Sequence, residues 1–233
     1  MRHAARQLPS WLIFDVRQMK QERTRGFYFD ALRISFAIAR RTHNRLWHTL
    51  AEIEPQFSAT GTYDELIASA FSDVWTMVDV LHRVREIAQQ FTVLPKRSAE
   101  KELFVRGTGD VEQLRHHVQH LRTEIPKLPD ISHPLFGSVA WVSAKEPQKC
   151  FSIWSGSLLQ GIQTYSCTYD RFARCYVQKL LLCSAGFSFD LEDAVRKLFA
   201  FEEALRGSSQ EVEKILGMAL GLAYTVEVKR ENA

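Results

Sequence analysis

Hydrophobic residues recur at helical spacing through the first half of the chain. Between Tyr28 and Ile53 neither glycine nor proline interrupts the pattern, which predicts a long amphipathic helix. Its apolar positions are Leu32, Phe36, Ala39, Leu46 and Leu50. A second stripe predicts a helix that begins at Thr62 or Asp64 and ends near Phe91, before Pro95. That stripe is Leu66, Ala70, Val74, Val78 and Leu81, widened by Phe71 and Trp75.

Residues 96–109, KRSAEKELFVRGTG, interrupt the apolar pattern and are predicted to form a basic connector with a loop between Gly107 and Gly109. Asp110 and Gln113 have the spacing of a capping box, so we expect a third helix to begin there. This helix should end before Pro126.

The pattern changes after Pro134. The segments LFGSVAWVSA, CFSIWSGSLL and CYVQKLLLCSA are rich in aromatic and β-branched residues, which favours three or four strands in an antiparallel meander. Asp190 is then expected to cap a helix over 191–207 that ends at Gly207, and a short helix is expected over 211–222.

The predicted class is therefore α+β. An N-terminal helical bundle, residues 1–130, precedes a small antiparallel β meander with one or two C-terminal helices, residues 131–233. The boundary near 127–134 is short, so the two regions can pack as one body.

Composition excludes few functions. Apolar residues make up 45% and charged residues 24%, as in ordinary globular domains, and the net charge of +3 does not by itself indicate a nucleic-acid binder. The apolar run Trp11–Phe14 is too short for a signal peptide, and no stretch is long enough to span a membrane. Cys150, Cys167, Cys175 and Cys183 form no CxxC pair, so we expect reduced, mostly buried thiols in a cytoplasmic protein.

The segment LRHHVQH, residues 114–120, carries the strongest chemical signal. At 100° per residue, the apolar side chains of the third helix form one stripe, which comprises Val111, Leu114, Val118, Leu121 and Ile125. A contiguous polar face lies beside it and comprises Arg115, His116, Gln119 and His120. His117 falls on the other flank, where a structural role is the expected one.

Three interpretations fit this polar face. It can simply be solvated, as helix faces usually are. His116 and His120 are four residues apart and could share a zinc ion, but no third ligand accompanies them, so no metal is predicted. The third interpretation is phosphodiester cleavage, because histidine transfers protons near neutral pH and the arginine fork fits phosphate. Arg115 and His120 diverge by about 140° on a straight helix, so a two-fold dimer would help both reach one phosphate.

The arrangement R-x4-H near the start of a helix, formed by Arg115, His116 and His120, resembles the signature of the HEPN superfamily. The resemblance covers roughly residues 28–126. It implies a helical bundle, a homodimer and, in many members, a metal-independent ribonuclease of a toxin–antitoxin or other defence system. Carried over, Arg115 and His120 are catalytic and His116 supports them, with no cofactor. Gln119 departs from the pattern, since Glu often precedes the last histidine.

Basic and acidic residues elsewhere could assist this chemistry. Lys96, Arg97, Lys101 and Arg106 are candidate RNA-binding residues immediately before the motif. Arg40, Arg41, His43 and Arg45 form a second basic group on the first long helix, and Asp73, Asp79 and His82 are candidate polar neighbours of the motif. If the protein is a toxin-like ribonuclease, an antitoxin or other protein partner is expected. The alternative function is a non-catalytic helical protein of unknown role that dimerises or binds a partner through the same polar face.

Overall fold

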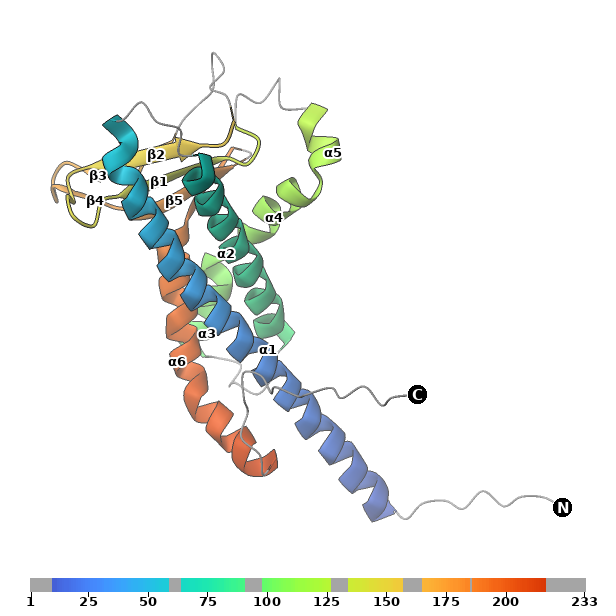
Figure 1. The fold of residues 1–233 in the computed structure, drawn as a ribbon. Coiled ribbons are helices and arrows are strands. Elements are labelled where there is room, and N and C mark those ends of the chain that lie inside the picture. The colour runs from blue at the N-terminus through green and yellow to red at the C-terminus, as the bar shows by residue number, and fades with distance from the viewer. Residues whose placement is uncertain are drawn as a thin grey trace, which may run out of the picture.

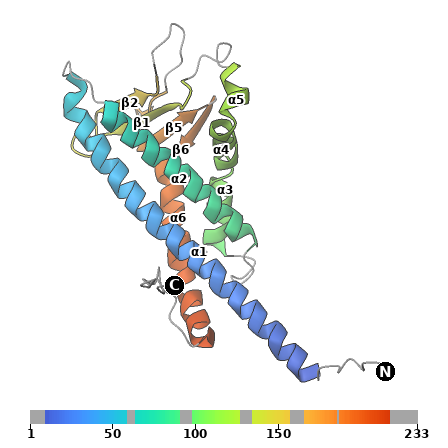
Figure 2. The same cartoon turned by 45° about the vertical axis from the view of Figure 1, so that its right-hand side comes forward.

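A computed structural model describes residues 10–58, 64–90, 98–126, 134–156, 165–184 and 186–216. In these residues the protein is a mixed α and β fold, mostly helical, with a small antiparallel sheet and a C-terminal helix. Helices α1 (Ser10–Ile53), α2 (Asp64–Gln90) and α6 (Leu191–Leu216) form the main bundle. The sheet lies at one end of this bundle, where α1 ends and α6 begins (Figures 1 and 2).

The two predicted long helices are confirmed. Helix α1 covers the predicted range and begins earlier, at Ser10, while α2 begins at Asp64 and ends within one residue of the predicted Phe91. Their predicted apolar stripes are buried at most positions, including Leu32, Phe36 and Leu46 of α1. A short 3-10 helix, η1 (Glu54–Ser58), follows α1.

The C-terminal helix completes the core of the bundle. Phe201 of α6 makes an edge-to-face contact with Phe36 of α1 at 6.2 Å between ring centroids, and it stacks on Phe104 at 5.5 Å. All three rings are buried. The largest hydrophobic cluster therefore joins side chains from both regions that the sequence distinguishes.

The predicted basic connector is wrong over most of its length, because α3 (Ala99–Gly107) occupies it. Ser98 caps this helix by accepting a hydrogen bond from the Lys101 N–H at 3.4 Å, and Phe104 anchors it in the core. The expected Asp110 cap is also wrong. Asp110 has helical φ and ψ, and its side chain accepts no capping bond, since a capping residue normally needs an extended backbone.

The predicted third helix is broken at His120. Helix α4 (Val111–Gln119) ends there and α5 (Leu121–Glu124) follows, with φ −109° and ψ 34° at His120. The Thr123 N–H and hydroxyl both donate to the His120 carbonyl, at 2.9 and 2.8 Å, and this tight turn replaces the regular helical pairing. As a result Ile125, expected in the core stripe, is 48% exposed.

The sheet is antiparallel but is not a meander. Its four strands are β1 (Ser138–Val142), β2 (Cys150–Trp154), β5 (Leu180–Ser184) and β6 (Phe187–Asp190), in the order β2-β1-β5-β6. A separate two-stranded hairpin, β3 (Tyr169–Asp170) and β4 (Cys175–Tyr176), intervenes between β2 and β5. The predicted strand over 175–185 is therefore two strands, and β6 was not predicted.

Both faces of the sheet are covered, and all of β1 is buried. Alternate residues Val139 and Trp141 join the main core against the helices, whereas Ala140 and Val142 join a second, smaller core on the opposite face. The indole N–H of Trp141 donates to Glu54 at 3.1 Å, and the Ser143 hydroxyl donates to the same carboxylate at 2.8 Å. The sheet is thereby tied to the end of α1.

Helix α6 begins immediately after β6. The predicted cap is confirmed, because Asp190 Oδ1 accepts a hydrogen bond from the Asp193 N–H at 2.9 Å. The predicted end at Gly207 is wrong, since α6 continues to Leu216. It therefore absorbs residues 211–216 of the separate short helix that was expected, and the rest of that helix lies outside the described residues.

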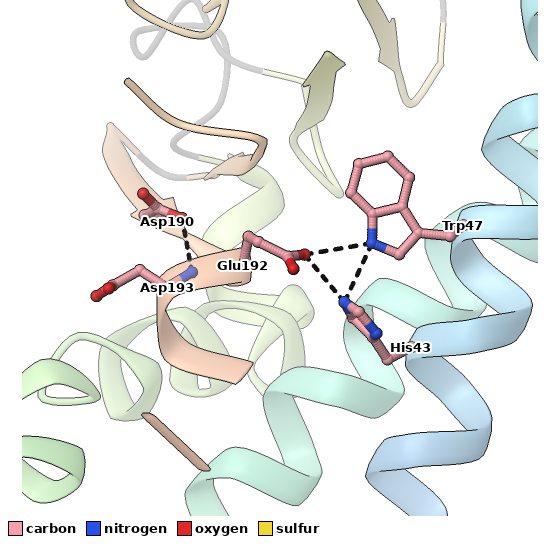
Figure 3. A network of polar contacts seen from close by, with 5 residues as sticks. All are labelled: His43, Trp47, Asp190, Glu192 and Asp193. Atoms are coloured by element: carbon pink, nitrogen blue, oxygen red, sulfur yellow. Dashed lines mark hydrogen bonds and ion pairs between the residues drawn. The ribbon is translucent and has the colours of Figure 1, made fainter. Parts of the chain in front are cut away.

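A polar network joins the start of α6 to α1 (Figure 3). Glu192 Oε2 lies 2.9 Å from His43 Nε2 and 3.2 Å from the indole nitrogen of Trp47, which is itself 3.1 Å from His43 Nε2. Tryptophan can only donate, so the consistent arrangement has both His43 Nε2–H and Trp47 N–H donating to the carboxylate. Burial alone would raise the pKa of Glu192, but its hydrogen bond and charge interaction with His43, together with Trp47, lower it.

An ion pair between an exposed arginine and a buried carboxylate joins α1 to α2. Arg45 Nε lies 2.9 Å from each carboxylate oxygen of Asp73, whose side chain is 1% exposed. A buried carboxylate without a partner carries a large desolvation cost. Arg45 therefore compensates the desolvation cost of the Asp73 carboxylate between the two helices.

We expect Arg45→Ala to lower the free energy of unfolding by about 3 kcal/mol, because it leaves the Asp73 charge buried and unpaired. Urea denaturation at neutral pH measures this change. Arg41→Ala removes an exposed arginine from the same helix and should change stability by no more than about 0.5 kcal/mol. Equal effects of the two substitutions would contradict the assigned role of the pair.

The Glu192 network should make stability depend on pH. The pKa of Glu192 is lower in the folded state than in the unfolded state. Its contribution to stability is therefore fully present above the unfolded-state pKa and disappears as pH falls through the folded-state pKa. We expect Glu192→Gln to cost about 1 kcal/mol at pH 7, and expect the difference from wild type to shrink below about pH 4.5. Glu203→Gln, which breaks an exposed ion pair with Arg206 on the same helix, should cost under about 0.5 kcal/mol at either pH.

Candidate functional site

Helix α4 presents the polar face that its sequence predicts. Val111, Leu114 and His117 are buried, and α4 packs on α2. Arg115 is partly exposed, whereas His116, Gln119 and His120 are exposed on the side away from this packing. His117, expected to be structural, lies 4% exposed within the packed face.

Arg115 is held by an acidic residue from the neighbouring helix. Its Nε lies 3.0 Å from Asp79 Oδ1 of α2, and the two side chains are 37% and 53% exposed. With the Gln119 amide oxygen turned toward the guanidinium, that oxygen lies 2.8 Å from Nη2 and 3.1 Å from Nε. These contacts orient one edge of the guanidinium, and Nη1 makes no hydrogen bond within the described residues.

The two exposed histidines of the motif are neighbours. The ring centroids of His116 and His120 are 4.2 Å apart, and their planes are inclined by 43°. Within the described part of the chain no hydrogen bond joins Arg115 to His120. The polar face therefore consists of two adjacent i, i+4 pairs, Arg115–Gln119 and His116–His120.

This arrangement suits proton transfer and anion binding better than metal binding. Two imidazoles in contact can act as a base and an acid on one substrate, and the free edge of a guanidinium can bind phosphate oxygens. No group of three or more metal-ligating side chains occurs in the ranges that the structure describes. His116 and His120 accordingly have no third ligand beside them there.

Two of the four proposed RNA-binding residues, Lys101 and Arg106, lie in the described part of the chain, before the start of α4. Arg106 is exposed and Lys101 is partly buried, both on α3, whereas Lys96 and Arg97 fall outside the described residues. Helix α4 has nine residues, so its length of roughly 13 Å, at about 1.5 Å per residue, separates Arg106 from His120. Contact with both would require a ligand at least that long.

Most of the basic group on α1 is committed to internal contacts. Arg40 Nη2 lies 2.6 Å from Glu202 Oε2, and the guanidinium lies over the Phe199 ring at 4.6 Å. His43 and Arg45 contact Glu192 and Asp73, as described above. Of this group, only Arg41 is exposed and has no ion pair or hydrogen bond within the described residues. The group therefore stabilises the packing of the helices and is a weaker candidate for an RNA-binding surface.

Of the three candidate polar neighbours on α2, only Asp79 contacts the motif. Asp73 pairs with Arg45, and His82 Nδ1 lies 3.7 Å from Glu86 Oε2. The sequence placed all three on one helix but could not show which of them faced α4.

A largely apolar cavity of about 470 Å³, which sequence reasoning missed, lies on the other flank of α4. Val118 lines it and lies two residues from both His116 and His120, which places it about 200° from each around the helix. The cavity is therefore separate from the histidine pair. Its other walls include Ile67, Phe71, Trp75, Phe136 and Ser155.

The cavity joins segments that no local pattern connects, since Phe136, Ser155 and Gly156 flank strands of the sheet while the remaining walls are helical. The indole nitrogen of Trp75 is buried and has no hydrogen-bond partner within the described residues. Among the described residues, Asp64 is the one carboxylate that lines the cavity, and no second acid–base side chain accompanies it in that lining. The polar face of α4, which has two neighbouring histidines and an arginine, is therefore the stronger candidate for a reaction.

No helix in the described ranges is both long and apolar enough to cross a lipid bilayer. Comparison with known proteins identifies no relative: no family model, no curated protein and no solved structure matches the chain.

Proposed function

We propose that the protein is a metal-independent endoribonuclease that cleaves RNA by attack of a ribose 2′-hydroxyl on the adjacent phosphate. The observation that carries this proposal is the exposed contact between His116 and His120, whose ring centroids are 4.2 Å apart, on the same helix as an Arg115 that Asp79 orients. Composition and charge contribute little to the argument, so the proposal depends on the chemistry of this face.

The reaction needs one base and one acid. One imidazole of the pair, in its neutral form, takes the 2′-hydroxyl proton as the 2′-oxygen bonds to phosphorus. The other, in its protonated form, gives a proton to the 5′-oxygen as the phosphorus–oxygen bond breaks. The products are a 2′,3′-cyclic phosphate and a 5′-hydroxyl, and no metal-bound nucleophile is needed.

Arg115 would stabilise the charge that grows on the phosphorane. Asp79 and Gln119 hold the Nε side of its guanidinium, which leaves Nη1 available for a phosphate oxygen. Asp79 also offsets part of the positive charge. Asp79 therefore acts as a positioning residue, which fixes the guanidinium but weakens the electrostatic attraction of this face for RNA.

The separation between Arg115 and His120 supports a two-fold dimer as the active form. A second copy of α4 facing the first would place the arginine of one protomer beside the histidines of the other. The 48% exposed Ile125, just beyond the break in the helix, provides apolar surface for such a contact. A helical bundle with this motif and arrangement is what the HEPN resemblance implies, and a toxin restrained by a protein partner in the cytoplasm is the corresponding biological role.

One observation favours the non-catalytic alternative. The Arg115–Asp79 pair and the exposed Ile125 together form a mixed polar and apolar surface, as many protein interfaces do. In that case the same face would bind a protein partner or a second copy without any reaction.

We expect the purified protein to cleave a mixed RNA substrate in EDTA and to leave 2′,3′-cyclic phosphate ends, detected by end-specific ligation or mass spectrometry. His116→Ala and His120→Ala should each reduce the rate by about 100-fold or more, because each removes a proton-transfer group. His48→Ala and Gln113→Ala are matched controls, since both residues are exposed and Gln113 lies on the same short helix. Neither control should change the rate more than about twofold.

Cleavage that persists in both motif variants would exclude this active site, and cleavage restored only by added metal would exclude the mechanism. If circular dichroism shows that the wild-type protein is folded and it still cleaves no RNA, the interface function becomes the better explanation. Co-purification of a partner that Ile125→Asp releases would then support that alternative.

We expect Asp79→Ala to lower kcat about tenfold without raising KM, because the guanidinium is no longer held while the surface becomes more positive. Steady-state kinetics on a short RNA separate the two parameters. Glu65→Ala removes the same charge from an exposed position on the same helix and should leave kcat unchanged. A rise in KM at constant kcat would show that Asp79 does not position Arg115.

A further inference from the structure

Three of the four cysteines meet in the smaller core on the outer face of the sheet. Cys167 and Cys183 are buried there with Ala140, Val142 and Leu181, and Cys150 packs against them. The fourth, Cys175, is exposed on the β3–β4 hairpin. All four are reduced thiols in the structure. The sequence predicts mostly buried thiols, and the structure buries two of the four, Cys167 and Cys183.

Cys150 and Cys167 meet where residues 165–168 lie beside β2. Cys150 is the first residue of β2, an edge strand, and is paired with Val142 of β1. The segment 165–168 is fixed beside this strand from both sides. The Ser152 hydroxyl donates to the Tyr165 carbonyl at 3.5 Å, and the Val177 N–H donates to the Thr168 carbonyl at 2.8 Å.

The two thiols of this pair interact directly but differ in environment. Cys150 packs on the cluster that holds Cys167, and its thiol lies 3.7 Å from the Phe151 carbonyl oxygen. Hydrogen bonding by the Cys167 thiol lowers the pKa of Cys150 to about 7, although partial burial opposes this shift. The same bond, together with burial, raises the pKa of Cys167. Cys150 is partly exposed and Cys167 is 3% exposed. The thiol whose pKa is lowered is therefore the more exposed of the two, and the thiol whose pKa is raised is enclosed.

We propose that Cys150 and Cys167 form an oxidation site, in which a hydroperoxide converts the pair into an intramolecular disulfide. The proposal rests on the contact between the two thiols and on their unequal exposure. It is independent of RNA cleavage by α4.

The chemistry balances in two steps. The Cys150 thiolate attacks the peroxide, so that a sulfur–oxygen bond forms, the oxygen–oxygen bond breaks, and the departing oxygen leaves as water or an alcohol after taking a proton. The Cys167 sulfur then attacks the Cys150 sulfenic acid. A sulfur–sulfur bond forms, the sulfur–oxygen bond breaks, and the hydroxide leaves with the Cys167 proton as water. The two thiols together supply the two electrons that reduce one peroxide.

The sheet register excludes Cys183 as the partner of Cys150. Cys183 is opposite Ser138 and Cys150 is opposite Val142, at the two ends of β1. Four residues of strand amount to about 13 Å, at about 3.3 Å per residue, and a disulfide does not bridge Cα atoms more than about 7 Å apart. Burial also raises the pKa of the Cys183 thiol to about 12, so it remains protonated.

The test is to treat the reduced full-length protein with hydrogen peroxide and to map its disulfides by mass spectrometry of peptides digested without reductant. We expect an intramolecular Cys150–Cys167 link that dithiothreitol reverses, with Cys175 and Cys183 unmodified. In Cys167→Ser, a dimedone adduct should accumulate on Cys150, because the sulfenic acid has no neighbouring thiol to attack it. Cys150→Ser should form neither the link nor the adduct.

Cys175→Ser is the matched control, since it removes an exposed thiol and should leave the link unchanged. Iodoacetamide labelling at pH 7 provides a readout on the unmutated chain, in which Cys150 should react about tenfold faster than Cys175. The proposal is overturned if peroxide leaves Cys150 unmodified, or if the link joins Cys150 to Cys183, to Cys175 or to a second chain. The wild-type peptide map decides these outcomes even if a serine variant does not fold.

Discussion

The direct junction of β6 with α6 at Asp190 is the constraint on which the rest of the fold depends. No residue separates the strand from the helix, and the Asp190 carboxylate accepts the Asp193 N–H at that point. The direction of the sheet therefore sets the direction of the C-terminal helix. Glu54 provides a second tie by accepting from Trp141 and Ser143 at the end of α1. Between these two ties, sheet and bundle become one packed body with a shared core.

The parts of the fold that could be predicted are those that local periodicity encodes. Uninterrupted apolar stripes identified α1 and α2, and Asp190 identified the start of α6. Helix α3 could not be predicted from its charges, because such a density of charged residues is equally typical of a connector. Ser98, followed by Glu100 and Glu102, is a helix start that local reasoning could have found. The break at His120 contains neither glycine nor proline, and only the Thr123 hydrogen bonds reveal it.

In the candidate site, too, contacts within one helix could be predicted from the sequence, whereas contacts between helices could not. The His116–His120 pair follows from i, i+4 spacing on one helix, so its contact was available from the sequence. The Arg115–Asp79 and Arg45–Asp73 pairs each cross between helices, and one sequence cannot rank the carboxylates of α2 as partners. This is why the basic residues of α1 first resembled a binding surface, although carboxylates from other helices neutralise most of them. The meeting of Cys150 with Cys167 likewise depends on the packing of residues 165–168 beside β2, which local periodicity does not encode.

The position of Phe201 in the last helix has a consequence for the order in which the molecule can assemble during synthesis. Its ring contacts Phe36 and Phe104, so the interior surfaces of α1 and α3 remain uncovered while the chain is still emerging. The β1–β5 pairing is also delayed until the hairpin between them has been made. A nascent chain that ends within the sheet thus exposes aromatic surface, and it acquires its complete interior only when α6 leaves the ribosome.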